Sequence, residues 1–320
     1  MVWTSDFGKG RYKEGMKTPL VSVIMPAYNH ERYVGEAIES VLNQTFSDFE
    51  FIIINDGSTD STDSVIRSFN EPRIRYYTQE NIDAPHTINK GLSLARGKYI
   101  SIINSDDAYH PERLGYLVET ADKHDAHFLF TDIVFIDESS NPINDESNKH
   151  VSWMKDLKEL YQSTGSMKKT LFSGNIAASS SNFFFNSRVI QEIGTFSTHR
   201  YVHDYDFILK TLLKYPDKLK FIADKKYLYY RLHEKNTIRE STLKVRKEVI
   251  TFLLYKMPEF VKSEEDRAFV ESAIKRIDFL NTLIADELNS LQNTLSWKIT
   301  SPIRKVGRIM IKSGIIKKGR

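Results

Sequence analysis

The chain has 320 residues, 40% of them hydrophobic, and carries 45 Lys and Arg against 42 Asp and Glu. This length allows a substantial core and suits one large domain with an appendage better than two equal domains. Cysteine is absent and no run of about 18 apolar residues occurs, which excludes a disulfide framework and a thiolate zinc site, argues against a membrane-spanning helix and favours a cytoplasmic protein.

The first half of the chain alternates short β-rich runs with helical patterns. Residues 1–18 mix charges with glycines and lack an apolar segment, which predicts a flexible leader and not a secretory signal. Strands are then predicted over 21–27, 49–55, 73–78 and 99–103, and helices over 31–43, 61–69, 87–95 and 111–124. Such alternation with continuous apolar strands predicts a mostly parallel α/β sheet with helices on both faces.

The second half has a less regular pattern. A strand is predicted over 128–137, followed by a polar, turn-rich loop to residue 150. Further on we predict a strand over 182–185, helices over 188–193 and from 203, and one or two strands within 219–232. Beyond about residue 236 the pattern is wholly helical.

Ligands in parallel sheets gather at the carboxyl ends of the strands. Four polar loops follow the predicted strands of the first half: "PAYNH", "NDGSTDST", "QENIDAPH" and "NSDDAYH". In the last of them, Asp106 and Asp107 end a strand as two adjacent acids, which costs desolvation and repulsion unless positive charge or open solvent compensates. The loops together indicate a nucleotide-type pocket, and the acids favour a cation within it.

The ordered set of motifs resembles family 2 glycosyltransferases with the GT-A fold. The motifs are "VSVIMPAYNHERYVGEAIESVLNQTF", "FIIINDGSTDST", "NKGLSLARGKYISIINSDDAYHPERL", "EIGTF", "HDYDF" and "YYRLHEKNT". The resemblance covers roughly residues 19–237. It implies a Rossmann-like, mixed but mostly parallel sheet and an inverting, metal-dependent transfer of a sugar from a nucleotide-diphosphate donor, with Mn²⁺ or Mg²⁺ as cofactor.

The same resemblance suggests the residues of a cation site. Asp106 stands where the family has the second acid of its DxD motif, and Asn104 replaces the first acid. His233 resembles the late histidine that completes the cation site or touches the diphosphate. We therefore expect Asp106 and His233 to bind the metal, with Asp107 beside them. Oxygen ligands suit Mg²⁺ and Mn²⁺, which leave positions open for phosphate oxygens.

Other motif positions suggest a nucleotide site. Asp56 resembles the acid that accepts from a uracil or thymine imide N–H, and Tyr28 is either a stacking face for the base or plain core. The loop near Asn89 departs from the family pattern, because Ile88 and Asp83 replace a frequent arginine and glycine. The remaining nucleotide candidates are Pro26, Ala27, Asn81, Asn89, Asn104 and Ser105.

Inverting transfer needs a carboxylate that takes a proton from the acceptor hydroxyl. The family places it as the Asp of a Glu-Asp pair at a helix start, and here the pair reads His203-Asp204. Asp204 is therefore the expected base, with Asp206 as an alternative. His203 either orients an acceptor or is exposed, and Arg231 pairs with a phosphate or with a carboxylate.

Two further segments follow the predicted transferase domain. Residues 238–296 are predicted to be helical, and an apolar seam from 263 to 295 suits either a coiled coil between copies or packing on the same chain. Residues 297–320 carry eight Lys and Arg and no Asp or Glu, interleaved with large apolar residues. This basic amphipathic tail suits an anionic membrane surface, and no nucleic-acid module is recognised.

These observations predict an enzyme that extends a surface glycan. The stretch "SWKITSPIRK" resembles C-terminal segments of bacterial surface-polysaccharide glycosyltransferases, which implies a lipid-linked acceptor. The expected location is peripheral, on the inner face of the cytoplasmic membrane, and the expected donor is a UDP- or dTDP-sugar. The alternatives are a sugar-nucleotidyltransferase, whose Gly-rich loop is lacking here, and a non-catalytic partner that binds a nucleotide sugar or a glycan.

Overall fold

The computed structural model describes residues 18–234 and 236, with isolated positions at 248, 249, 251, 252, 259 and 267. The chain divides into two units, Met1–Tyr255 and Lys256–Arg320, and the fold described here is that of the first. Most of the predicted leader, helical extension and basic tail lies outside the described residues. Among the helices that are described, none has the length and apolar character to cross a membrane.

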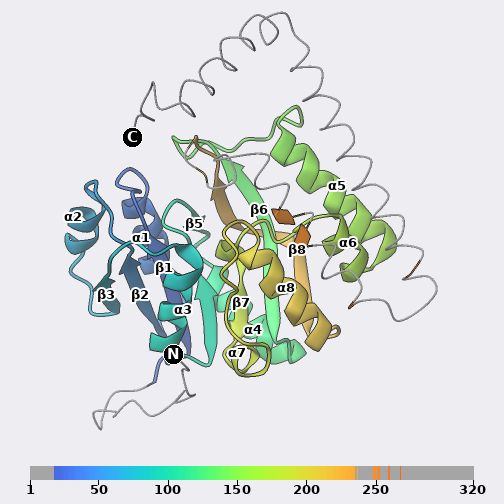
Figure 1. Ribbon diagram of the computed structural model, residues 1–320, viewed down its shortest axis with the longest axis horizontal. Helices are drawn as coiled ribbons and strands as arrows, with labels where there is room; N and C mark the ends of the chain where they lie inside the picture. The colour runs from blue at the N-terminus through green and yellow to red at the C-terminus, as the bar shows by residue number, and fades with distance from the viewer. Residues whose placement is uncertain are drawn as a thin grey trace, which may run out of the picture. The chain divides into compact units, whose positions relative to one another are not determined.

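The described part of the chain forms one eight-stranded sheet with the order β3-β2-β1-β4-β7-β6-β8-β5 (Figure 1). Strands β3, β2, β1 and β4 are parallel, β7 lies antiparallel between β4 and β6, and β8 is parallel to β6. The strands are β1 Val21–Ala27, β2 Phe49–Asn55, β3 Ile74–Thr78, β4 Tyr99–Ile102, β5 Ala108–Tyr109, β6 Phe128–Ile136, β7 Phe184–Asn186 and β8 Leu219–Arg231. The predicted mixed, mostly parallel sheet is confirmed.

Helices lie on both faces of this sheet, with α3 and α8 in front of it and α4 behind it in Figure 1. They are α1 Val34–Leu42, α2 Thr62–Arg67, α3 Ala84–Leu94, α4 Arg113–His124, α5 Lys149–Thr164, α6 Met167–Ser173, α7 Arg188–Ile193 and α8 His203–Lys214. A 3-10 turn covers Ser180–Asn182. Covering both faces explains why every residue of β1 and β2 is buried.

Close packing fixes the helices on the sheet. A Cβ built on Gly91 of α3 would lie 2.3 Å from Cγ2 of Ile24 in β1, so only glycine allows this approach. On α8, the ring of Phe207 stacks on Phe196 with centroids 4.2 Å apart and packs against Phe185 of β7. These contacts fix the amino-terminal end of α8 relative to the loops at the sheet edge.

Several predicted elements differ from the observed ones. Helices α5 and α6 and strand β5 are not among the predicted elements, and of the one or two strands expected within 219–232 the structure has one, β8. The strand expected over 182–185 begins at Phe184, because the side chain of Asn182 bonds to the backbone of Thr131. The helix expected from 111 begins at Arg113, and the carbonyl of Pro111 accepts from the N–H of Thr45.

The topology brings two distant parts of the chain to the same sheet edge. Strand β7 is antiparallel to both β4 and β6, so β4, β6 and β8 point the same way. The carboxyl ends of β1, β2 and β4 therefore meet the carboxyl end of β8. Residues after β8, including His233, consequently arrive beside the loop after β4 that contains Asp106.

Candidate active site

A cavity of about 590 Å³ opens at this edge of the sheet. Its volume is within the range of small-molecule sites. The loops after β1, β2 and β4 line one part, and residues 178–180 and the start of α8 line another. Of the residues suggested by the sequence, the cavity is lined by Pro26, Ala27, Tyr28, Asp56, Asn81, Asn104, Ser105, Asp106, Asp107, His203 and Asp204.

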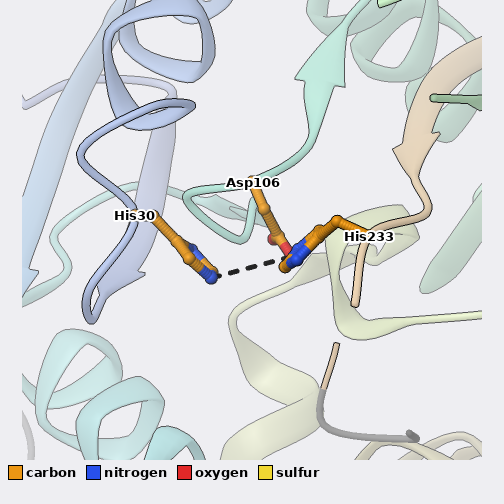
Figure 2. A group of neighbouring side chains, drawn as sticks. All are labelled: His30, Asp106 and His233. Atoms are coloured by element: carbon orange, nitrogen blue, oxygen red, sulfur yellow. Dashed lines mark hydrogen bonds and ion pairs between the residues drawn. The ribbon is translucent and has the colours of Figure 1, made fainter. Parts of the chain in front are cut away.

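His30, from the loop after β1, and Asp106, from the loop after β4, line the cavity. The side chain of His233, from beyond β8, is buried next to them (Figure 2). The Nε2 atom of His233 lies 3.0 Å from Oδ2 of Asp106, and Nε2 of His30 lies 4.0 Å from the same oxygen. Burial opposes ionisation of Asp106, but the charge of His30 and the hydrogen bond with His233 outweigh it. The pKa of Asp106 therefore lies below its usual value.

This donor set fits a divalent cation. Oδ2 of Asp106 and Nε2 of His233 are 3.0 Å apart. Two neighbouring ligands of a cation with bonds of about 2.1 Å are separated by about 3 Å, so the pair needs little movement to bind one. Carboxylate oxygen and imidazole nitrogen are both ligands that Mn²⁺ accepts.

Arg231 stabilises the loop after β4 that carries Asp106. Its Nε donates to the carbonyl oxygen of Asp106 at 2.8 Å, and its Nη2 lies 2.6 Å from Oε2 of Glu36 on α1. The guanidinium carbon lies 5.0 Å from the centroid of the Tyr33 ring, and that ring packs on His233 with centroids 5.0 Å apart. Arg231 is 1% exposed. Of the two roles left open for it, the structure shows pairing with a carboxylate.

The second acid, Asp107, is buried and bonded within the protein. Its Oδ2 accepts from the hydroxyl of Ser181 at 2.6 Å, and its Oδ1 accepts from the backbone N–H of Arg231 at 2.9 Å. Burial and the neighbouring charge of Asp106 raise the pKa of Asp107 well above its usual value. Asp107 therefore ties the loop after β4 to the 3-10 turn before β7 and to the end of β8.

Asp56 follows β2, lines the cavity and is 3% exposed. Its Oδ1 accepts from Nε2 of Gln79 at 2.6 Å and from the backbone N–H of Ile82 at 3.1 Å. Gly57 has a φ of +73°, and a Cβ there would lie 2.7 Å from the backbone nitrogen of Asn81. The loop is therefore fixed so that a carboxylate faces the cavity.

Tyr28 is 44% exposed, which excludes the core role for its side chain. Asn104 is tied to the turn before β7: its Nδ2 donates to Oγ of Ser179 at 3.0 Å and its backbone N–H donates to Oγ of Ser181 at 2.8 Å. Asn104 thus joins the loop after β4 to the part of the cavity wall that includes residues 178–180.

Asp204 lies in the first turn of α8 and faces the cavity from its other side. Its Oδ2 accepts from Nδ2 of Asn175 at 3.1 Å, and its Oδ1 accepts from the backbone N–H of Tyr205 at 2.7 Å. Burial raises the pKa of Asp204 although these donors and His203 oppose the shift. His203 is half-buried and not exposed, and its Nδ1 has no hydrogen-bond partner among the described residues.

Some suggested residues have contacts away from the cavity. Both amide atoms of Asn89 bond to the backbone of Phe196, at 2.8 and 2.9 Å. Asp206 is buried and pairs with Lys210 one turn later at 2.5 Å. His30, which lines the cavity, is not among the residues suggested by the sequence. It is part of the "PAYNH" loop, and only the arrangement of β1, β4 and β8 reveals its position.

The sequence model described as "Glycosyl transferase family 2" matches residues 22–194, more than half of the chain. An uncharacterized glycosyltransferase of Rickettsia prowazekii is 37% identical over 113 residues, which are 35% of each chain. The chain thus spans about a third of the length of this curated relative.

Among solved structures, the chain resembles Staphylococcus aureus TarS in complex with UDP-GlcNAc, with a TM-score of 0.58 and 18% identity over 87% of this chain and 77% of that one. It also resembles the mannosyltransferase PcManGT of Pyrobaculum calidifontis in complex with GDP-Man and Mn²⁺, with a TM-score of 0.55 and 14% identity over 94% and 82% of the two chains. At these identities the likeness concerns the fold, which is of the predicted GT-A type. With its sequence match and this fold, the chain belongs to glycosyl transferase family 2.

Proposed function

We propose that this protein is an inverting, metal-dependent glycosyltransferase. It moves a sugar from a UDP- or dTDP-sugar to a hydroxyl of a growing, lipid-linked surface polysaccharide. The observation that carries the proposal is that Asp56, Asp106 and Asp204 line the same cavity of about 590 Å³. Asp56 suits the base of the donor, Asp106 suits a cation beside the diphosphate, and Asp204 suits the acceptor hydroxyl. The reaction must bring these three parts together.

The donor binds with its base at Asp56. The imide N–H of uracil or thymine donates to the carboxylate of Asp56, which Gln79 and Ile82 hold in place. Tyr28, at the mouth of the cavity, stacks on the base. Cytosine, which has no imide N–H, is the poorer match for this acceptor.

Asp106 and His233 hold the divalent cation beside the diphosphate. When bound, the cation acts as a Lewis acid that stabilises the negative charge on the leaving nucleoside diphosphate. Arg231 and Asp107 keep the loop that carries Asp106 in position.

Asp204 is the general base. Its carboxylate takes the proton of the acceptor hydroxyl as that oxygen attacks the anomeric carbon, and the bond from this carbon to the diphosphate oxygen breaks on the opposite face. The configuration at the anomeric carbon is therefore inverted. The amide of Asn175 orients the carboxylate by donating to Oδ2.

Two structural neighbours, solved with UDP-GlcNAc and with GDP-Man and Mn²⁺, support the class of donor.

The basic tail, residues 297–320, places the enzyme on the anionic inner face of the cytoplasmic membrane, where a lipid-linked acceptor is available. Sedimentation with vesicles of phosphatidylglycerol and phosphatidylcholine tests this part. We expect the full chain to bind at low salt and a chain ending at residue 296 to remain in the supernatant. Equal sedimentation of the two would contradict a membrane role for the tail.

Analytical ultracentrifugation of the full chain tests self-association through residues 238–296.

A thermal-shift screen of nucleotides and nucleotide sugars, with and without Mn²⁺, tests the donor site. A ligand that binds only the folded state raises the melting temperature. We expect UDP or dTDP to stabilise the wild type with Mn²⁺ and to lose this effect in Asp106→Ala. If no nucleotide shifts the melting temperature, the donor site is wrong. Donor hydrolysis or transfer that is lost in Asp204→Asn distinguishes an enzyme from a non-catalytic binding partner.

A further inference from the structure

We propose that His30 is a third protein ligand of the cation, so that the site is a His–Asp–His triad and not an Asp–His pair. The inference rests on the proposed cation-dependent function and names a residue that the motif comparison did not suggest. It is carried by the position of the His30 ring beside Asp106 and His233 (Figure 2).

The distances suit a shared cation. One ligand atom from each of the three residues lies within 4.8 Å of the other two. The Nε2 atom of His30 is 4.0 Å from Oδ2 of Asp106, which is too long for a hydrogen bond. A cation with bonds of about 2.1 Å separates opposite ligands by about 4 Å and neighbouring ligands by about 3 Å. Closing the triad on a cation therefore requires shifts of an ångström or less at the ring of His30.

A histidine that binds a metal through one ring nitrogen usually makes a hydrogen bond with the other, and Nδ1 of His30 has such a partner. Its Nδ1 lies 2.8 Å from Oγ of Ser105, a side chain that is 1% exposed. A hydrogen donated from Nδ1 to Ser105 leaves Nε2 as the acceptor nitrogen on the side of Asp106. The backbone N–H of His30 donates to Oγ1 of Thr62 at 2.9 Å, which fixes the start of the side chain. The ring is therefore held at Nδ1 by Ser105, and the backbone of His30 is held by Thr62.

The small number of carboxylates at the site gives a chemical reason for a second histidine ligand. Asn104 stands where a second carboxylate would be, so Asp106 is the one carboxylate of the triad. Two neutral imidazoles add ligands without adding negative charge. Imidazole nitrogen favours first-row transition ions, Co²⁺ and Zn²⁺ more than Mn²⁺, whereas Mg²⁺ prefers oxygen ligands. We therefore expect a site that binds Mn²⁺ or Co²⁺ more tightly than Mg²⁺.

Electron spin echo spectroscopy of the full-length protein with Mn²⁺ and UDP tests the proposal, because it detects the ¹⁴N nuclei of imidazoles bound to the ion. We expect the wild type to show two such nitrogens, and His30→Asn and His30→Gln to show one. The dissociation constant of Mn²⁺, measured from the signal of the free ion, should rise tenfold or more in both variants. His124→Asn, which changes an exposed histidine at the end of α4, should leave the spectrum and the dissociation constant unchanged.

The outcomes separate this inference from the proposed function. If Mn²⁺ binds with UDP but both His30 variants keep two nitrogens and the wild-type dissociation constant, His30 is not a ligand and the Asp106–His233 site remains. If the wild type binds no Mn²⁺ with any nucleotide, the cation-dependent function and the triad both fail. Because the side chain of His30 is 19% exposed, we expect both variants to fold, and their melting temperatures without ligand check this.

Discussion

The side-chain amide of Asn175 donates a hydrogen bond to Oδ2 of Asp204 at 3.1 Å. This bond stabilises the ionised carboxylate, whereas burial raises its pKa. A base must be ionised to accept a proton, so if Asp204 is the base, as proposed, we expect activity to fall as the pH drops through its pKa. Removing the amide in Asn175→Ala leaves burial less opposed and raises this pKa further. The acidic limb of kcat/KM against pH should therefore move to higher pH.

The matched control for this pH profile is Asn70→Ala, which removes an exposed amide after α2. We expect its acidic limb to coincide with that of the wild type. An acidic limb in Asn175→Ala that stays in place or moves to lower pH would contradict the assignment of Asp204 as the titrating base.

Asp204→Asn should separate catalysis from donor binding. An amide cannot take the acceptor proton, and a positioned base contributes roughly 10²–10⁴-fold to a rate. Asn has the same shape as Asp, and its carbonyl oxygen can still accept from either the backbone N–H of Tyr205 or the amide of Asn175, so one of the two hydrogen bonds should remain. We expect kcat to fall by at least about 100-fold while the UDP-induced thermal shift stays at the wild-type value. A variant with near wild-type kcat would assign the base elsewhere.

Loss of Arg231 should destabilise the protein much more than loss of the charge of its ion-pair partner, Glu36. Arg231 is 1% exposed and also donates to the backbone oxygens of Asp106 and Asp137. Arg231→Met leaves these acceptors without their donor, and we expect a loss of about 3–5 kcal/mol in the free energy of unfolding. The side chain of Glu36 is 43% exposed, so Glu36→Gln should cost no more than about 1 kcal/mol.

Urea denaturation of these two variants measures the difference. Equal destabilisation of Arg231→Met and Glu36→Gln would mean that the ion pair itself, and not the backbone acceptors of Arg231, determines the loss.

Two helical glycines should respond in opposite ways to alanine. In Gly91→Ala, the new Cβ would meet Ile24 at 2.3 Å, so we expect a loss of about 1–3 kcal/mol from overpacking between α3 and β1. In Gly115→Ala on α4, the atom nearest to the new Cβ is Cβ of Phe46 at 3.6 Å, an ordinary contact. Alanine is the better helix former, so this variant should be neutral or more stable by up to about 1 kcal/mol. Thermal or urea unfolding compares the pair.

The strands of the first half were predictable because each is a continuous apolar run. The strand predicted over 21–27 matches β1, and the one predicted over 49–55 matches β2. Helix α5 lacks such a signal, since only Met154 and Leu157 of its 16 residues are buried. Strand β5 has two residues, Ala108 and Tyr109, and exists because β8 is there to pair with it. Elements that depend on a distant partner leave little periodicity in the sequence.

The residues of the candidate site also fall into those that the sequence predicts and one that it does not. Asp56, Asp106 and Asp204 stand out as acids in recognisable motifs at the ends of elements. His30 is one polar residue in a polar loop, and nothing in its neighbours distinguishes it from a solvated histidine. Its place beside His233 follows from the strand order, which no local pattern encodes.

The parallel pairing of β6 and β8 also sets a folding order. Leu219 pairs with Phe128, about 90 residues earlier, so closing this ladder carries a larger entropic cost than forming the β1–β2 unit. During synthesis the Asp56 end of the cavity can assemble while β8 is still being made, but His233 reaches Asp106 only after β8 has joined the sheet. A growing chain is therefore expected to form the loop that carries Asp56 first and to lack the proposed cation site until its last strand is in place.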